Sequence, residues 1–145
     1  MKRSLRIYCD TNVYLDILKD DREGAEVSRR IMGLLHSLGI TPYLSTQSII
    51  DASYIMCKGH NYGIDKFIAA FHITKAHFDL VSITTSDILV AEENSIGDFE
   101  DAAQMACAER LGCEVILSSD KSFKNRSKIP VYSPRELLAK LTCAN

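Results

Sequence analysis

Four separate segments of the chain each carry aspartate where an expected strand gives way to a helix, or where a helix begins. The candidates are Asp10, Asp51, Asp98, Asp101 and Asp120. Carboxylate oxygens are the ligands that hard divalent cations prefer, and Mg²⁺ is usually held by a few carboxylates together with water and substrate phosphate. A cation held in this way can activate water for in-line displacement at a phosphodiester. The residue types therefore indicate a metal site for cutting phosphodiester bonds.

Each of these aspartates also has an ordinary structural explanation. Asp98 could cap a helix and Asp101 could complement the helix dipole in the first turn. Asp10 and Asp120 could be turn residues, and Asp51 a solvated helix residue. What favours a site is convergence, because all four segments are expected to bring an aspartate to the same edge of the fold.

Short β-prone or apolar runs alternate with segments of helical periodicity along the whole chain. The expected strands lie at 5–9, 43–44, 78–83 and 114–117, with an edge strand at 130–132. The expected helices lie at about 13–19, 22–38, 46–56, 63–75, 84–95 and 98–111, and from 134 onwards. This alternation predicts an α/β fold in which helices cover both faces of a mostly parallel sheet. We expect one domain over residues 1–145, a length that can bury a sizeable core.

Parallel sheets of this kind bind ligands outside the carboxyl ends of their strands, near the point where the strand order reverses. Asp10 directly follows the first expected strand, and Asp120 follows the strand at 114–117 within three residues. Asp98 and Asp101 are spaced so that both carboxylates lie on one helix face, where they repel each other unless something positive sits between them.

The composition bounds the function less sharply. The formal net charge of -2 gives no global basic field of the kind that attracts nucleic acid. Five cysteines without a CxxC pair indicate thiols in a reducing compartment. No run of about 18 apolar residues occurs. We therefore expect a cytoplasmic protein without a membrane partner. The four histidines are scattered and suggest no metal site.

Four segments, taken in order, resemble the acidic motifs of the PIN-domain nucleases. Residues 7–16 (IYCDTNVYLD) are similar to the family's first strand and the Asp-Thr-Asn that follows it. Residues 44–51 (LSTQSIID), 98–104 (DFEDAAQ) and 115–123 (VILSSDKSF) resemble the second, third and fourth segments. The resemblance spans almost the whole chain.

The resemblance implies a three-layer α/β/α sandwich and a metal-dependent ribonuclease acting on RNA, like the VapC toxins of toxin-antitoxin pairs. An antitoxin protein and a second copy of the chain in a homodimer would be its protein partners. By position, Asp10, Asp51, Asp98 or Asp101, and Asp120 would hold Mg²⁺ or Mn²⁺, and Asp101 is favoured over Asp98 because it precedes Ala102. Thr11, Asn12 and Ser118 would support these ligands.

Two positions depart from the family's pattern. Asp51 stands where the family usually has the longer glutamate, and Ser118-Ser119-Asp120 lacks the usual arginine, with Ser122 in the place of a further acid. An alternative is therefore a weakly active or inactive module that binds nucleic acid or protein. Basic residues close to the site segments could grip phosphates, although a solvated surface explains each of them equally well; they are Lys58, Lys121, Lys124 and Arg126.

Overall fold

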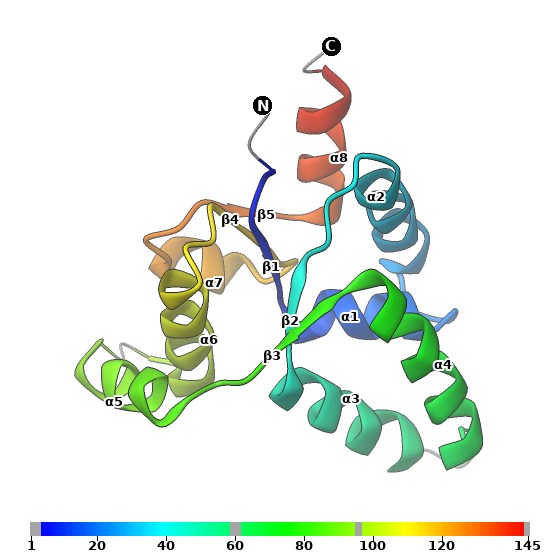
Figure 1. Cartoon of the computed structure of the whole chain (residues 1–145), viewed down its shortest axis with the longest axis horizontal. Helices are drawn as coiled ribbons and strands as arrows, with labels where there is room; N and C mark the ends of the chain where they lie inside the picture. Colours follow the sequence, from blue (N-terminus) through cyan, green and yellow to red (C-terminus); the bar gives the residue numbers. More distant parts are fainter. Residues whose placement is uncertain (1–3, 59–61, 95–96, 144–145) are drawn as a thin grey trace.

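The computed structural model describes residues 4–58, 62–94 and 97–143. Within them, one parallel sheet has the strand order β3-β2-β1-β4-β5 (Figure 1). The strands are β1 (Ile7–Cys9), β2 (Tyr43–Ser45), β3 (Asp79–Val81), β4 (Val115–Leu117) and β5 (Val131–Tyr132). The helices are α1 (Thr11–Leu18), α2 (Ala25–Ser37), α3 (Thr46–Lys58), α4 (Ile64–His77), α5 (Thr85–Asn94), α6 (Phe99–Arg110), α7 (Lys121–Arg126) and α8 (Pro134–Cys143).

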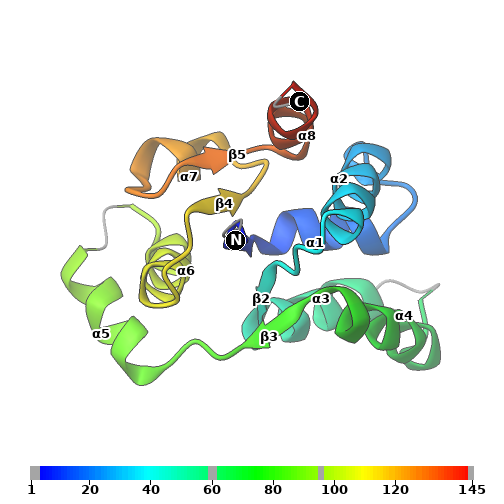
Figure 2. The same cartoon turned by 45° about the horizontal axis from the view of Figure 1, so that its top comes forward.

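Side chains of the central strand β1 alternate between two hydrophobic cores. Ile7 and Cys9 pack into the core that includes residues of α1, α2, α3, α4 and α8, and Tyr8 packs into the core on the side of α6 and α7. All three residues are fully buried, as expected for a parallel strand covered on both faces. Figures 1 and 2 show the sheet between these two groups of helices, with α5 outside α6. The predicted three-layer α/β/α sandwich is therefore confirmed.

The strand order reverses between β1 and β4. The chain first adds β2 and β3 on one side of β1, and then crosses through α5 and α6 to place β4 and β5 on the other side. Cys9 is in register with both Leu44 and Leu117, so the carboxyl ends of β1, β2 and β4 lie at one edge. The backbone N–H of Asp10 donates to the carbonyl of Leu117 at 2.9 Å and ties the two strand ends together.

The expected strands and helices are confirmed, with small differences at their ends. Helix α2 begins at Ala25, three residues later than expected, because Arg22 forms an ion pair with Asp16 at 2.6 Å ahead of the helix. Helix α7 was not expected. The last expected residue of the α5 segment, Ser95, lies outside the described residues. None of the described helices has the length and apolar character needed to cross a membrane.

Helix α6, which carries the third acidic segment, is fastened to α5 by a buried ion pair. Arg110 donates from Nε and Nη2 to the two carboxylate oxygens of Asp87, each at 2.9 Å. Asp87 is 2% exposed and also accepts from the backbone N–H of Thr84 at the start of α5. Burial raises the pKa of Asp87, but the hydrogen bonds from Arg110 and Thr84 outweigh burial and hold this pKa below its ordinary value.

We expect Asp87→Ala to lower the free energy of unfolding by about 1 to 3 kcal/mol at pH 7, because the backbone N–H of Thr84 loses its acceptor and Arg110 loses its charged partner. The pKa of Asp87 is lower in the folded state, so its stabilisation is present above the unfolded pKa and is lost as the pH falls through the folded pKa. Urea unfolding at pH 7 and below pH 4 measures both effects. The exposed Glu92→Ala on the same helix is the control and should stay within about 0.5 kcal/mol. An equal loss in both variants would contradict the prediction.

Candidate functional site at the carboxyl edge of the sheet

Asp10 lies at the centre of this edge and is 5% exposed. It caps α1, and its Oδ1 accepts hydrogen bonds from the backbone N–H of Thr11 at 2.7 Å and from Nε2 of Gln104 at 3.1 Å. Its Oδ2 accepts from Oγ of Ser118 at 2.6 Å. Burial raises the pKa of Asp10, these three donors oppose the rise, and the charge of Asp120 adds to it, so the net direction is upward. The carboxylate is thus fixed in orientation by three different elements.

Ser118 links Asp10 to Asp120. Its hydroxyl donates to Asp10 and accepts from the backbone N–H of Asp120 at 3.1 Å. Asp120 caps α7, and its Oδ1 accepts from the backbone N–H and the hydroxyl of Ser122 at 2.9 and 2.7 Å. These bonds lower the pKa of Asp120. Ser122, at the position where the resemblance led us to expect a further acid, therefore donates its hydroxyl to the carboxylate of Asp120.

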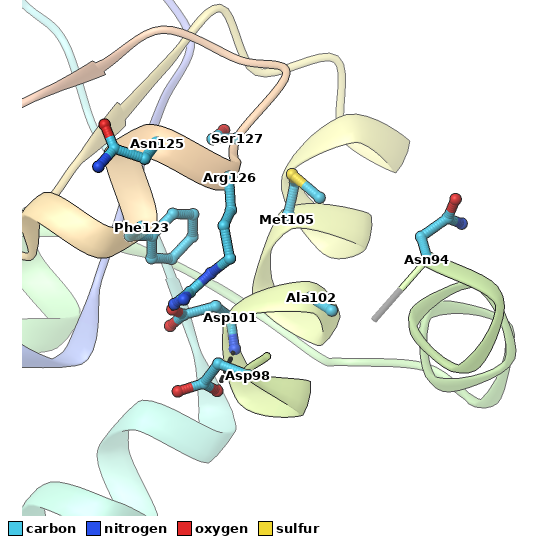
Figure 3. A pocket seen from close by; sticks show the side chains of 9 residues that line it. All are labelled: Asn94, Asp98, Asp101, Ala102, Met105, Phe123, Asn125, Arg126 and Ser127. Carbon is cyan, nitrogen blue, oxygen red and sulfur yellow. Dashed lines mark hydrogen bonds and ion pairs between the residues drawn. The ribbon is translucent and has the colours of Figure 1, made fainter. Parts of the chain in front are cut away.

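Asp98 and Asp101 stand at the start of α6, beside a cavity of about 320 Å³ (Figure 3). Asp98 caps the helix by accepting from the backbone N–H of Asp101 at 3.1 Å. Figure 3 shows Arg126 reaching from α7 to Asp101, with which its Nη2 forms an ion pair. Burial raises the pKa of Asp101, the hydrogen bond from Arg126 lowers it, and Asp98 and Asp10 raise it further, so the net direction is upward.

The segment at the end of β2 contributes Asp51 and the hydroxyl of Ser48. Asp51 on α3 accepts from Nε2 of Gln47 at 2.9 Å. The hydroxyls of Thr11 and Ser48 lie 2.6 Å apart, so the predicted supporting residue Thr11 joins α1 to α3. Asn12, the other predicted supporting residue on α1, has a buried Oδ1 that finds no hydrogen-bond partner within the described part of the chain.

Two site residues were not predicted, and both are on α6. Glu100 and Gln104 lie one helical turn apart, and Nε2 of Gln104 contacts Oε1 of Glu100 at 3.5 Å as well as Asp10. Burial raises the pKa of Glu100, and the charges of Asp51, Asp10, Asp98 and Asp101 raise it further. A sequence signal was available: Gln104 is the one uncharged polar side chain between Ala102 and Ala108, in a stretch otherwise made of small or apolar residues.

These acids all lie at the carboxyl edge of the sheet. In the described part of the chain, however, no three His, Cys, Asp or Glu side chains form a group that could hold a metal ion. Asp10 and Asp120 are engaged by hydrogen-bond donors and Asp101 by Arg126. The side chains that could hold a cation at this edge are carboxylates, whose ligand atoms are oxygens. That chemistry fits Mg²⁺ or Mn²⁺ held by one or two carboxylates and completed by water. The ligand assignment made from the sequence stays a prediction.

The four basic residues expected near the site have different surroundings. Arg126 binds Asp101, and Lys124 instead pairs with Glu136 on α8 at 2.8 Å. The ammonium group of Lys58 lies over the ring of Tyr54, 5.1 Å from its centroid. Lys121 is exposed at the first residue of α7. Of these four residues, Arg126 is the one that interacts with a carboxylate of the candidate site.

Fold and site together define a parallel α/β domain whose acidic residues gather at the point of strand-order reversal. The model of the PIN domain family matches residues 6–122, so the chain belongs to that family. It is similar to Ribonuclease VapC1 of Aquifex aeolicus (strain VF5), with 27% identity over 127 residues that cover 83% of this chain and 85% of the relative.

Solved structures with the same fold share little sequence with this chain. VapC20 of Mycobacterium tuberculosis, a sarcin-ricin loop cleaving toxin, has a TM-score of 0.65 at 16% identity and covers 82% of this chain and 93% of its own. VapBC2 of Rickettsia felis, bound to a promoter DNA fragment, has a TM-score of 0.69 at 12% identity, covering 89% and 98%. DNA-bound VapBC of Salmonella typhimurium has a TM-score of 0.68 at 15% identity, covering 90% and 98%.

We expect Ser118→Ala to lower the free energy of unfolding by about 1 to 3 kcal/mol, because the buried Asp10 loses a donor and the N–H of Asp120 loses its acceptor. Urea unfolding of the metal-free protein at pH 7 measures this loss. Ser119→Ala removes a hydroxyl from the neighbouring exposed position and should change stability by less than about 0.5 kcal/mol. If the two variants were equally stable, Ser118 would not hold Asp10.

Proposed function

We propose that this protein is a metal-dependent endoribonuclease that hydrolyses RNA phosphodiester bonds. The observation that carries the proposal is the position of Asp10, a buried carboxylate held by three donors at the strand-order reversal, with further acids beside it. Membership of the PIN domain family and the similarity to Ribonuclease VapC1 support this function. Carboxylates at such a position can hold a cation that acts on a phosphodiester.

Mg²⁺ or Mn²⁺ is the proposed cofactor, with Asp10 and Asp101 as its principal ligands. Asp51, Asp98 and Asp120 complete the acidic pocket around them. When bound, the cation would activate water and neutralise charge that builds on the phosphate. Within the chain, Ser118 and Gln104 orient Asp10, and Thr11 fixes the start of α1 against α3. Arg126 forms an ion pair with Asp101 and so links α6 to α7 beside the site.

We further propose that the protein is the toxin of a toxin-antitoxin pair and that its partner is an antitoxin protein. The similarity to the VapBC structures supports this assignment. An apolar cavity of about 410 Å³ between α1, α2 and α4 offers a surface for such a partner, and Ile73, which lines it, is 65% exposed. A homodimer stays a prediction, which sedimentation equilibrium of the purified chain would decide.

Asp10→Asn is expected to reduce RNA cleavage at least about 100-fold, because it removes one negative ligand with almost no change of shape. The assay is cleavage of a mixed-sequence RNA in Mg²⁺ or Mn²⁺ at equal protein concentration. Asp65→Asn, an equivalent change at an exposed position on α4, is the control and should cut like wild type. Equal activity of Asp10→Asn and wild type would refute the proposed mechanism.

Divalent cations are expected to stabilise the wild-type protein, since a ligand that binds only the native state raises its stability. At ten times its dissociation constant the cation contributes about 1.4 kcal/mol, which raises Tm by about 3 to 6 °C for a chain of this size. Thermal unfolding with and without Mg²⁺ or Mn²⁺ measures the rise, which Asp10→Asn should largely remove. Absence of a shift with both cations at millimolar concentration would favour the inactive binding module.

A further inference from the structure

A second cavity, of about 490 Å³, opens between α3, α5 and α6 and adjoins the acidic site. Its volume lies within the range of small-molecule sites, about 300 to 1,000 Å³. Its apolar lining includes Ile83, Ile88, Ala103 and Phe99. The ring of Phe99, on the first residue of α6, is 47% exposed although it is large and apolar. An exposed aromatic ring beside an acidic RNA-cleaving site is suited to stacking against an unpaired base.

The polar lining of this cavity is rich in hydrogen-bond acceptors. Glu100 and Asp51 bring carboxylates to it. The amide nitrogen of Gln47 donates to Asp51. Gln104, also in the lining, is 2% exposed; its Nε2 contacts Asp10 and Glu100, and its buried Oε1 has no hydrogen-bond partner among the described residues. Carboxylates repel a phosphate at this place. The lining therefore fits a ligand that has several hydrogen-bond donors and little charge.

We propose that this cavity is the binding site for a guanine base of the RNA next to the cleaved phosphate, with Glu100 as the residue that reads it. This inference rests on the proposed ribonuclease function. The Watson–Crick edge of guanine carries two adjacent donors, N1–H and the N2 amino group, and a carboxylate accepts both through its two oxygens. The base stacks on Phe99, and its remaining amino hydrogen lies on the side of Gln104.

The other three bases fit this lining less well. Adenine and cytosine each present an amino donor beside a ring nitrogen whose lone pair would face the second carboxylate oxygen. Uracil presents one N–H between two carbonyl oxygens. Each of these bases therefore puts an acceptor against the negative charge of Glu100, and an unmatched acceptor lowers affinity.

Mapping of cleavage sites in a random-sequence RNA pool tests the proposal. Wild type is expected to prefer guanine beside the cut by about 10-fold or more over the other bases, the discrimination of one good bidentate contact. Glu100→Gln replaces one acceptor oxygen by a donor, so the guanine preference should fall about 10-fold and adenine should gain. Preference is compared within each variant, so a change in overall rate does not affect it. Glu109→Gln, on the exposed far end of α6, is the matched control and should keep the wild-type preference.

A nucleoside titration separates this proposal from the ribonuclease function. Guanosine, adenosine, cytidine and uridine are titrated into the metal-free protein at millimolar concentration and followed by NMR. Guanosine alone should bind strongly, Glu100→Gln should weaken it about 10-fold, and Phe99→Ala should weaken all four nucleosides.

If the protein cuts RNA without a guanine preference, or if Glu100→Gln keeps that preference, the base assignment is wrong and the ribonuclease function stands. If no RNA is cut, the ribonuclease function fails and the titration decides: selective guanosine binding that Glu100→Gln removes supports the site, and equal or absent binding of the four nucleosides overturns it.

Discussion

Burying the charge of Asp10 at the end of the central strand is the constraint on which the rest of the structure depends. A buried carboxylate is costly unless donors surround it. Here the donors come from the first turn of α1, from Ser118 after β4 and from Gln104 on α6. The strand order has to place β4 next to β1, and α6 has to cross that edge. The Asp87–Arg110 ion pair acts on the same arrangement, because it fastens α6 to α5.

Repulsion among the remaining acids is distributed unevenly around α6. On the side of α7, Arg126 compensates Asp101, and Asp120 is satisfied by Ser122. On the side of α3, Glu100 lies near Asp51, and neither residue has a positively charged side chain among its described contacts. Helix α6 therefore separates two halves of the acidic site. Protein groups compensate the negative charge of one half, and the negative charge of the other half is available to a ligand. The two cavities that flank α6 correspond to these halves.

The spacing of the apolar residues and the turn and capping residues between segments were sufficient to predict the sheet, the helix layers and the edge where the aspartates lie. Asp10, Asp98 and Asp120 all cap helices, so the structural explanation holds for three residues that the sequence also nominates as metal ligands. What could not be predicted depends on side-chain direction across distant segments. The pairing of Asp101 with Arg126 follows from α7, a helix of six residues that is too short for a periodic pattern. Glu100 was hidden because its role depends on which face of α6 meets α3.

The contact between Asp10 and Ser118 joins residues 108 positions apart. During synthesis, the first strand and its aspartate leave the ribosome long before β4 exists, so the carboxylate has neither its hydroxyl donor nor its neighbouring strand. Such distant pairings form late, because the loop between them must close first. The growing chain therefore carries the separate segments of the acidic site but cannot assemble them until Ser118 and β4 have been made. The activity proposed for this site could thus begin only late in translation.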